Sequence, residues 1–575
     1  MRTCEHDVDL CVVGGGLSGL CAALAAARRG ASVVLIQDRP VLGGNSSSEI
    51  RMWIGGAKGR NNREGGIIEQ LLLENFRRNE LGNWRHWDLI LYEAALLQEG
   101  LTLLLNCTCN ELTMDGDCIE KVRAWQMTCE TFHLVRAKLF ADCTGDGILA
   151  PLSGAEFRIG REAASEFNED IEPEQADNRT MGLSLLPQPR EHHFPVEFHA
   201  PQWAKKLTDD DLPHRGRSVQ RQNFWWIELG GMADSIHDAE QIRDELLSYL
   251  LGIWDLAKNR DEPGLENWSL DWFGMLPGKR ESRRYVGDHI LTQNDVRAEG
   301  KFEDVVAYGG WSMDDHHPAG LAYKGEPTIF HPAPSPYGIP YRCLYSRNIE
   351  NLFCGGRAIS VTHAALSSTR VMATCAVIGQ AIGTAAAIAA GEEITPRQVG
   401  QNHIGRLQQQ LMDDDAYLPF NRRQPYQLTT QAELTATAGD PEPLRNGIDR
   451  PDAENYNGWQ GSPGDSVQLS WDRPVKISQI RLVFDSNCSR GDTRTNLPCA
   501  YPMDPRRLKV PRQLVKSFVI ESRDAGGNWL PVFGDDDNYQ RLRRIDVELE
   551  TRAIRLRCDA TWGDEHVKLF AIDAR

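Results

Sequence analysis

Residues 9–36 read DLCVVGGGLSGLCAALAAARRGASVVLI. The apolar run over residues 9–13 ends at glycines, which is typical of a buried parallel strand. Residues 17–29 are rich in Ala and Leu and stop at Gly30, so we expect a helix there. A second β-branched run over residues 32–36 predicts another strand. Together the three segments have the length of a βαβ unit, about 30 residues.

Three glycines between the first strand and the helix fit a phosphate-binding loop. Gly14 permits the tight turn, Gly16 lets the backbone approach a pyrophosphate, and Gly19 lets the helix pack closely on the strand. Leu17 and Ser18 complete the loop. The start of the helix offers N–H groups and a partial positive charge to phosphates. The sequence therefore predicts a dinucleotide site.

The end of the second strand departs from the usual dinucleotide pattern. A carboxylate normally stands there and binds the ribose hydroxyls. Here the position is Gln37, followed by Asp38. Gln37 is expected to hydrogen-bond a hydroxyl without contributing charge. Little would then repel a 2′-phosphate, but no Arg cluster argues for NADP.

Charge and composition narrow the classes of partner. The net charge is -18 and the sequence has no concentrated basic patch, so we expect no nucleic acid partner. The 14 cysteines include no CxxC pair, which favours reduced thiols and a cytoplasmic location. We find no credible metal-ligand set, and we interpret the acidic run 413–415 as a solvated face.

No segment is expected to enter a membrane. The polar N-terminus, residues 1–9, does not fit a signal peptide. The most apolar run, residues 371–390, is long enough to test as a membrane span. It is rich in Ala and contains Gly379 and Gln380, so we interpret it as a buried helix.

The order of patterns along the chain predicts an α/β protein with a C-terminal β-sandwich. A strand at 351–354, followed by two glycines and the Ala-rich helix, returns to the first domain after a long insertion. Many short alternating runs near the C-terminus indicate the sandwich. We expect a discontinuous Rossmann-like first domain (1–155 and 346–423), an inserted α+β substrate domain (156–345), a linker (424–443) and the sandwich (444–575).

Residues 41–49, which follow the second strand, carry a family resemblance. Their Gly-Gly pair resembles that of the glutathione-reductase-like FAD enzymes. The longer string is similar to the FAD-dependent oxidoreductase family, distantly related to the fumarate reductase flavoproteins. Residues 142–147, 277–284 and 351–360 match the same family. The resemblance covers about residues 1–420.

The resemblance implies FAD as the bound dinucleotide, held non-covalently because no His stands at the early position where fumarate reductase relatives attach flavin. It implies a place for each matching segment. Gly43, Gly44, Asn45 and Ser46 would pass near the ribityl chain; Thr144 and Gly145 near the adenosine half; Gly355, Gly356 and Arg357 near the pyrophosphate and ribityl chain; and Arg370 by the flavin or substrate, where the helix after Ser367 would point toward the flavin.

Oxidising an alcohol at the flavin needs a base for the hydroxyl proton, and His is the usual one. His363, His316 and His317 are the candidates, although each would also suit an ordinary hydrogen-bonded position. Arg280 is a candidate for binding a carboxylate or polarising a carbonyl, with a salt bridge as the alternative. Tyr337 is expected either to line a sugar-shaped pocket or to pack in the core.

The C-terminal region has a resemblance of its own. Residues 444–451, Trp459 and the strands after them look like a galactose-binding-like or discoidin-type sandwich over about 430–575. That fold often binds glycans through loops at one end, where Trp459 and Trp562 would be stacking residues. The alternative is a structural module, or a dimerisation module that would make the chain a homo-oligomer.

Taken together, these features predict an FAD-dependent oxidoreductase. Its substrate would be a small carbohydrate-derived molecule or an oligosaccharide, oxidised at a hydroxyl by hydride transfer to flavin, with an electron acceptor that the sequence does not identify. One alternative is a redox-neutral sugar-modifying enzyme that uses transient flavin oxidation and needs no external acceptor. The other is a glycan-binding protein with a structural flavin domain, in which sugars would not reduce the flavin.

Overall fold

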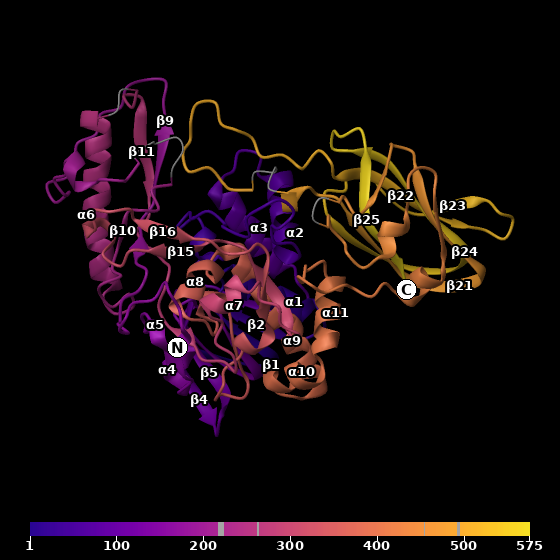
Figure 1. Ribbon diagram of the computed structural model, residues 1–575, viewed down its shortest axis with the longest axis horizontal. Coiled ribbons are helices and arrows are strands. Elements are labelled where there is room, and N and C mark those ends of the chain that lie inside the picture. The colour runs from indigo at the N-terminus through magenta and orange to yellow at the C-terminus, as the bar shows by residue number, and fades with distance from the viewer. Residues whose placement is uncertain (217–222, 262–263, 453–454, 491–494) are drawn as a thin grey trace. The chain divides into compact units, whose positions relative to one another are not determined.

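The computed structural model describes residues 1–216, 223–261, 264–452, 455–490 and 495–575 (Figure 1). The chain forms two compact units. Unit 1 comprises residues 1–57, 81–407 and 496–507, and unit 2 comprises residues 58–80, 408–495 and 508–575. Most of the expected FAD-binding and substrate domains thus falls in unit 1. Residues 58–80 and 408–423 of the expected FAD-binding domain belong to unit 2, and residues 496–507 of the expected sandwich belong to unit 1.

Unit 1 contains a seven-stranded sheet of order β3-β2-β1-β6-β5-β4, with β18 paired to β6. The β1–β2, β2–β3, β1–β6 and β6–β18 pairings are parallel, and the β4–β5 and β5–β6 pairings are antiparallel. The strands are β1 (Arg2–Val13), β2 (Val33–Ile36), β3 (Leu101–Leu104), β4 (Cys107–Asp115), β5 (Cys118–Gln126), β6 (Thr131–Asp142) and β18 (Leu352–Cys354). β1 starts earlier than expected because its polar first half pairs with β6 along its length.

Two helices pack closely beside this sheet. They are α1 (Leu17–Arg28) and α9 (Met372–Glu392). A Cβ atom at Gly379 would lie 2.0 Å from the carbonyl oxygen of Ser18, and one at Gly383 would lie 2.0 Å from that of Ala22. Glycine is therefore required at this crossing. The apolar window of α9 is 89% buried, as expected of a core helix.

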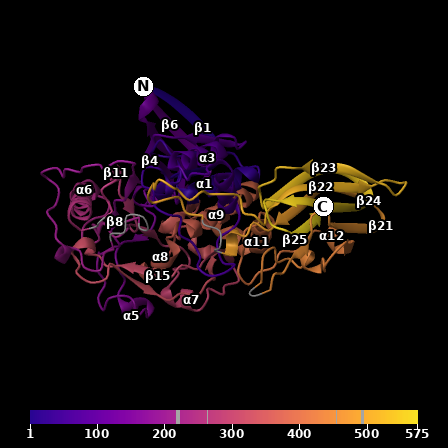
Figure 2. The same cartoon turned by 90° about the horizontal axis from the view of Figure 1, so that it is seen from above.

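The segment between β6 and β18 builds its own apolar core. Helix α6 (Ala239–Leu256) presents Leu246, Leu250 and Trp254 to a cluster that includes Trp268 of strand β11 (Trp268–Phe273). Helix α6 and β11 lie side by side in both views (Figures 1 and 2). The other helices of unit 1 are α3 (Trp84–Leu96), α4 (Leu149–Ser153), α5 (Ala164–Phe167), α7 (Gln293–Arg297), α8 (His363–Thr369) and α10 (Pro396–Asn402).

Short strand pairs complete unit 1. Their bounds are β7 (Phe157–Arg158), β8 (Leu183–Ser184), β9 (Pro187–Glu191), β10 (Glu228–Leu229), β12 (Gly278–Lys279), β13 (Arg284–Tyr285), β14 (Val305–Gly309), β15 (Met313–His316), β16 (Thr328–His331) and β17 (Tyr337–Pro340). The segment 496–507 belongs to unit 1 because two indoles bind it. Trp53 Nε1 donates to the Leu497 carbonyl at 3.1 Å, and Trp84 Nε1 donates to that of Pro498 at 3.2 Å.

Unit 2 is built on an antiparallel sheet of order β20-β25-β21-β24-β22-β23, with β19 paired to β21. The strands are β19 (Glu433–Ala436), β20 (Trp459–Gly461), β21 (Ser466–Phe484), β22 (Val515–Arg523), β23 (Trp529–Asp535), β24 (Leu542–Thr561) and β25 (Val567–Ala574). Helices α2 (Ile67–Arg78) and α12 (Gln427–Gln431) also belong to it, and α11 (Ile404–Asp413) spans the boundary between the units. The expected linker 424–443 therefore contains α12 and β19, and β19 is an integral strand of the sheet.

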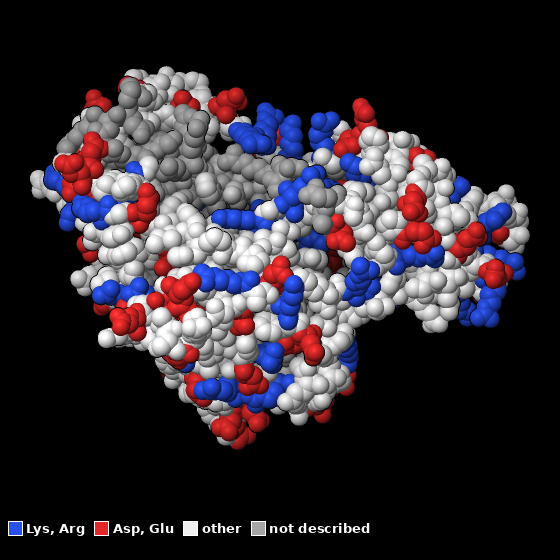
Figure 3. Space-filling model, viewed as in Figure 1, with Lys and Arg blue, Asp and Glu red and all other residues white. Residues whose placement is uncertain are grey.

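Charged side chains of both signs are interspersed over the face shown in Figure 3. Charged residues also pair within single helices: on α6, for example, Arg243 lies 2.6 Å from Glu240.

Candidate active site

Four segments that are distant in sequence meet at the carboxyl end of β1. A Cβ atom at Gly14 would lie 2.5 Å from the backbone of Cys143 and Thr144, and one at Gly145 would lie 2.8 Å from the Arg357 guanidinium. The Gly43 N–H donates to the Gly15 carbonyl at 2.9 Å. Gly355 and Gly356 lie against the Ser18 side chain. The structure thus brings together all four segments that the sequence assigns to the cofactor.

The three loop glycines differ in what surrounds them. Gly14 has a φ of +102°, a conformation that other residues rarely adopt. A Cβ atom at Gly19 would lie 1.8 Å from the Gly14 carbonyl oxygen, so Gly19 is required by packing. At Gly16 the nearest atom to an added Cβ is Gly44 Cα at 4.0 Å. Gly16 therefore faces open space, which suits close approach of a diphosphate.

Gln37 binds the loop itself. Its Oε1 accepts from the Gly15 N–H at 2.7 Å, and its Nε2 donates to the Val41 carbonyl at 3.0 Å. Both ends of this buried amide thus connect the phosphate loop to the chain after β2. Asp38 is exposed and lies 3.9 Å from Arg39. Gln37 therefore has both ends of its amide occupied and is not available to bind a ribose hydroxyl.

The convergence point fits the diphosphate of FAD. Helix α1 begins after Gly16. As at every helix start, its first N–H groups have no intrahelical acceptor, and Gly16 supplies no side chain to cap them. Arg357 supplies a positive charge, and its buried Nε has no hydrogen-bond partner among the described residues. Its Nη2 lies 3.0 Å from Asp146, which Lys279 also binds at 2.6 Å. Two cations facing one carboxylate leave a net positive charge for phosphate oxygens.

Asp146 and Lys279 were not singled out from the sequence, although both lie in segments that carry the family resemblance. Burial raises the pKa of Asp146, but the charges of Arg357 and Lys279 outweigh this effect and hold the pKa below its ordinary value. Ser282 also donates to Asp146, at 2.8 Å. The carboxylate therefore orients the two cations.

The remaining cofactor residues hold the loops in place. Ser46 Oγ donates to the Gly43 carbonyl at 2.9 Å, and Asn45 Nδ2 donates to that of Lys279 at 3.0 Å. Thr144 Oγ1 donates to Asp142 at 2.7 Å. These bonds rigidify the segments that the sequence places along the ribityl chain and the adenosine.

His363 is almost fully buried between two carboxylates. Its Nδ1 lies 2.9 Å from Glu281, and its Nε2 lies 3.3 Å from Asp315. Burial lowers the pKa of His363, but the charge of Glu281 and the hydrogen bonds with Asp315 and Glu281 hold it well above its ordinary value. The ring is therefore an imidazolium with both nitrogens occupied, which does not suit it to be the direct base.

His316 and Arg280 meet at another buried carboxylate, Glu228. His316 Nδ1 lies 2.6 Å from Glu228, and Arg280 Nη1 lies 3.3 Å from it. Arg280 also donates to Ser184 Oγ and to the Trp225 carbonyl, both at 2.9 Å. The salt-bridge alternative for Arg280 is thus the arrangement that the structure shows.

Arg370 connects this cluster to the start of α9. It caps α8, and its Nη2 donates to the Asp314 carbonyl at 2.9 Å. Asp314 lies 3.5 Å from His316 on the same strand, β15. The buried Nε of Arg370 has no partner among the described residues. That donor is available to a cofactor or substrate.

His317 and Tyr337 occupy different environments. The ring of His317 stacks on Tyr323 at 3.6 Å, and its Nδ1 accepts from the Ala319 N–H at 3.2 Å. Burial and then the charge of Arg161 lower the pKa of His317, so the ring is neutral. Tyr337 is fully buried, and its hydroxyl lies 2.6 Å from Ser368 Oγ. The structure thus places Tyr337 in the core.

Asp315 is the partly exposed member of the His363 cluster, at 20% side-chain exposure. Burial raises its pKa, but the hydrogen bond and charge of His363 outweigh that effect, so the pKa lies below its ordinary value. Neither Asp315 nor Glu281 was singled out from the sequence. The sequence indicated His363 itself, and a buried His needs an acidic partner. Which carboxylates lie beside it depends on the tertiary fold.

In unit 2, one of the two proposed stacking residues is buried, which corrects the expectation. Trp459 is 1% exposed, and its Nε1 donates to the Ala438 carbonyl, so its face is unavailable to a sugar. Trp562 is partly exposed and has Lys516 at 5.0 Å and Arg77 at 5.6 Å from its ring.

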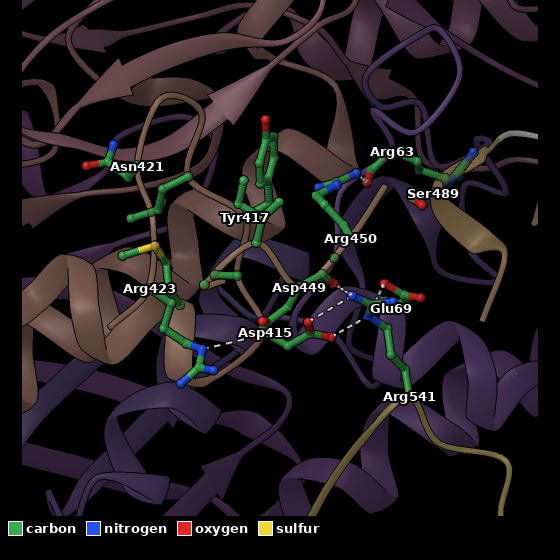
Figure 4. Close-up of a pocket in the computed structure, with 16 residues that line it drawn as sticks. Arg63, Glu69, Asp415, Tyr417, Asn421, Arg423, Asp449, Arg450, Ser489 and Arg541 are labelled. Carbon is green, nitrogen blue, oxygen red and sulfur yellow. Dashed lines mark hydrogen bonds and ion pairs between the residues drawn. The ribbon is translucent and has the colours of Figure 1, made fainter. Parts of the chain in front are cut away.

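A small cavity of about 40 Å³ lies within unit 2 (Figure 4). Ion pairs surround it: Arg541 lies 2.7 Å from Asp415, and Arg423 lies 3.1 Å from Asp449. A volume of this size holds a few waters rather than a sugar. The acidic run 413–415, expected as a solvated face, is therefore part of an ion-pair network, because Asp414 pairs with Arg544 and Asp413 lies 3.5 Å from Arg423.

Metal and thiol chemistry have no visible site in the described part of the chain. There, no group of three or more His, Cys, Asp or Glu side chains is arranged to hold a metal ion. All 14 cysteines are free thiols, and most are buried. Burial raises the pKa of Cys143, beside the phosphate loop, beyond the range in which thiols ionise near neutral pH.

Comparison with known families gives one match, to the family described as FAD dependent oxidoreductase, over residues 9–411. This match confirms FAD as the expected cofactor and an oxidoreductase as the class of enzyme. The comparison with curated proteins gave no match.

Solved structures similar to the chain include carbohydrate-binding modules. The family 32 module of Streptococcus pneumoniae EndoD is 13% identical with a TM-score of 0.20, and covers 26% of this chain and 97% of its own. The family 32 module of Clostridium perfringens NanJ, solved with galactose, is 9% identical with a TM-score of 0.18, and covers 26% of this chain and 95% of its own.

Proposed function

Because the chain belongs to the FAD dependent oxidoreductase family, we propose that it oxidises a hydroxyl group of a carbohydrate or carbohydrate-derived substrate. When bound, FAD supplies the acceptor for the hydride that leaves the substrate carbon. The residues of the chain then bind the cofactor, orient the substrate and accept the hydroxyl proton. The carbohydrate assignment rests on the resemblance of the C-terminal region to galactose-binding-like modules.

The observation that carries this proposal is the Glu281–His363–Asp315 chain, in which Asp315 is the exposed end. The Asp315 oxygen that does not face His363 accepts the hydroxyl proton as the carbon loses its hydride and becomes a carbonyl. His363 holds the other oxygen and keeps Asp315 ionised, so that it can accept a proton, while Glu281 fixes the ring. The same contact lowers the pKa of Asp315 and makes it a weaker base. The alcohol thus loses a proton from its oxygen and a hydride from its carbon, which is a two-electron oxidation.

The placement of this chain favours a role at the flavin. Asp315 follows Asp314, whose carbonyl binds Arg370, and His363 begins α8, which ends at Arg370. By the family resemblance, Arg370 would lie by the flavin or the substrate. Helix α9 begins two residues later, and its positive end would stabilise charge on the reduced ring.

We further propose that the unit 1 sheet is the Rossmann-like FAD-binding domain and that residues 156–345 form the substrate domain. The parallel pairing of β18 with β6, directly after this segment, supports a discontinuous domain. The separate apolar core around α6 supports an inserted domain.

An anaerobic screen of sugars tests the proposal, with flavin bleaching in the purified holoprotein as the readout. Bleaching by at least one carbohydrate is expected, and reoxidation should then require an added acceptor. Turnover without any acceptor would indicate the redox-neutral alternative. A flavin that no carbohydrate bleaches, but that non-sugar alcohols do, would contradict the substrate class.

A further inference from the structure

Arg51 carries a positive charge without a counter-ion, directly after the loop assigned to the FAD ribityl chain. Its N–H donates to the Ser47 carbonyl at 2.8 Å, and the next N–H donates to that of Asn45 at 2.9 Å. Among the described residues no carboxylate forms an ion pair with its guanidinium, whose neighbours are all neutral acceptors or a ring. The charge therefore lies beside the cofactor loop with no anion to balance it.

The guanidinium of Arg51 is held on three sides. Its Nε donates to the Ser48 carbonyl at 3.1 Å, and its Nη1 donates to Gln188 Oε1. The ring of Trp272 covers one face at 4.0 Å. No residue that the structure describes bonds Nη2. One N–H edge of a fixed planar cation is thus left available.

Neither nearby carboxylate forms an ion pair with Arg51, although the charges of both act on it and Asp88 Oδ2 has no hydrogen-bond partner among the described residues. Asp271 binds Arg190 through two hydrogen bonds of 2.9 and 3.1 Å, and Asp88 accepts from the Ser48 N–H at 2.9 Å. Burial lowers the pKa of Arg51 to about 10, against the raising effect of Tyr501, so the group is still cationic at neutral pH. A partly buried cation without a partner is costly, which is a reason to look for its anion outside the chain.

The backbone of Arg51 supports the same reading. Its φ is 64°, in the left-handed region that non-glycine residues seldom occupy. Such conformations persist where the surroundings impose them, and they gather at binding sites. Here the conformation turns the side chain of Arg51 toward the β9 and β11 strands, which supply Gln188 and Trp272.

We propose that Arg51 binds the carboxylate of the substrate, so that the substrate class is acidic saccharides, uronic acids or uronate-containing oligosaccharides. The inference rests on the proposed function. The unbonded Nη2 of the guanidinium offers a charge-assisted N–H donor to a carboxylate, which a neutral sugar lacks. The diphosphate of FAD is the other oxyanion within the same chemistry, and the test separates the two.

The test compares wild-type holoprotein with Arg51→Asn and Arg51→Lys, loaded with FAD. Asn is chosen because it tolerates the left-handed conformation. Arg85→Gln is the matched control, since Arg85 is exposed and acts on Arg51 only through its charge. Calorimetry measures binding of glucuronate, galacturonate and the matching neutral hexoses to the oxidised protein, and absorbance measures FAD content and anaerobic bleaching.

Arg51→Asn is expected to weaken uronate binding by about 10–100-fold, as for loss of a charge-assisted pair, and to change hexose binding by less than about threefold. Arg51→Lys should recover part of the loss, and Arg85→Gln should leave uronate binding unchanged.

Three results would overturn the proposal: equal weakening of uronates and hexoses, wild-type protein that binds no uronate, or a variant that loses FAD rather than uronate affinity. A wild-type protein that binds uronate through Arg51, while its flavin is indifferent to every sugar, would retain the carboxylate site and reject the proposed oxidation instead.

Discussion

The Nδ1 atom of His363 lies 2.9 Å from the Glu281 carboxylate, and both side chains are almost completely buried. Two ionisable groups at this depth are stable only as a charged pair with their remaining atoms bonded. The Nε2 atom completes the pair by facing Asp315. His363, a candidate from the sequence, thus has both ring nitrogens facing carboxylates, and Asp315 becomes the group to test for proton transfer.

Asp315→Asn should lower the rate of flavin reduction by substrate by about 10²–10⁴-fold, the usual contribution of a general base. FAD content should be unchanged, because Asp315 lies outside the segments that hold the diphosphate. Stopped-flow bleaching with the best sugar measures the rate. Asp170→Asn is the control, since Asp170 is an exposed carboxylate paired with Arg297. A normal rate in Asp315→Asn would exclude Asp315 as the base.

His363→Gln should change how stability depends on pH. The folded pKa of His363 is well above 6.5, so the folded state keeps a proton that the unfolded state releases. The stability that this proton contributes is fully present below pH 6.5 and is lost as pH rises through the folded pKa. The wild-type and variant unfolding free energies should therefore converge toward alkaline pH. Urea titrations from pH 6 to 10 measure both, and parallel curves would contradict a charged His363.

Glu172 predicts a pH effect with a different window. Burial raises its pKa from 4.5 to about 7, Oε1 accepts from the Ala364 N–H at 2.7 Å, and Oε2 has no partner among the described residues. The folded state binds the Glu172 proton more tightly than the unfolded state does. The unfolding free energy of the wild type should therefore fall as the pH rises from 4.5 to 7. The shift corresponds to on the order of 3 kcal/mol.

Glu172→Gln should remove that fall and be more stable than wild type at pH 8 by about 1–3 kcal/mol. Glu174→Gln, at an exposed position two residues away, is the control. Chemical denaturation at pH 4.5, 6 and 8 gives the comparison. A Glu172→Gln curve with the wild-type slope would mean that Glu172 ionises normally.

The phosphate loop was predictable because its constraints are local. Gly14 needs a positive φ and Gly19 needs close packing, and both requirements act on the glycines within one short segment. The same holds for α9, whose composition alone indicated a buried helix. Constraints that act within one short segment can be predicted from a single sequence.

The cluster around His363 could not be predicted in the same way. His363 is 82 residues from Glu281 and 48 from Asp315, so only the tertiary fold pairs them. Strand β19 was taken as linker because its sequence is polar, but backbone pairing with β21 decides its structure. Arg51 belongs to no sequence motif. It stands out only because no carboxylate pairs with it, which the tertiary structure alone reveals.

Gly16→Ala and Gly19→Ala should have different effects: the first should weaken FAD binding, and the second should destabilise the apoprotein. Gly16→Ala adds a Cβ whose nearest neighbour is 4.0 Å away, so the apoprotein should unfold at nearly the wild-type temperature while FAD affinity falls at least tenfold. Gly19→Ala places a Cβ 1.8 Å from a carbonyl oxygen and should destabilise the apoprotein itself. Thermal unfolding of apoprotein and fluorescence titration with FAD separate the two effects. Equal FAD affinity in Gly16→Ala would show that the diphosphate does not approach Gly16.

Arg481→Leu tests whether the buried ion pairs of unit 2 hold that unit together. Arg481 and Asp573 are both fully buried. Arg481 Nη1 lies 2.8 Å from Asp449 and 3.5 Å from Asp573, and its Nε donates to the Asp413 carbonyl at 2.9 Å. Removing one partner of a buried pair leaves the other charge without compensation, which costs about 3–5 kcal/mol. Urea unfolding at neutral pH should show this loss, whereas Arg552→Leu at an exposed position should change stability by less than about 0.5 kcal/mol.

The size of the loss in Arg481→Leu also reports on Arg423, which binds Asp449 and Asp573 from the other side. Burial raises the pKa of Asp573 despite both arginines, so this carboxyl is the one that would take up a proton when Arg481 is removed. A loss that shrinks as pH falls from 7 to 5 would identify that proton uptake. A loss below about 1 kcal/mol at every pH would mean that Arg423 alone satisfies both carboxylates, and the network would then be redundant rather than essential.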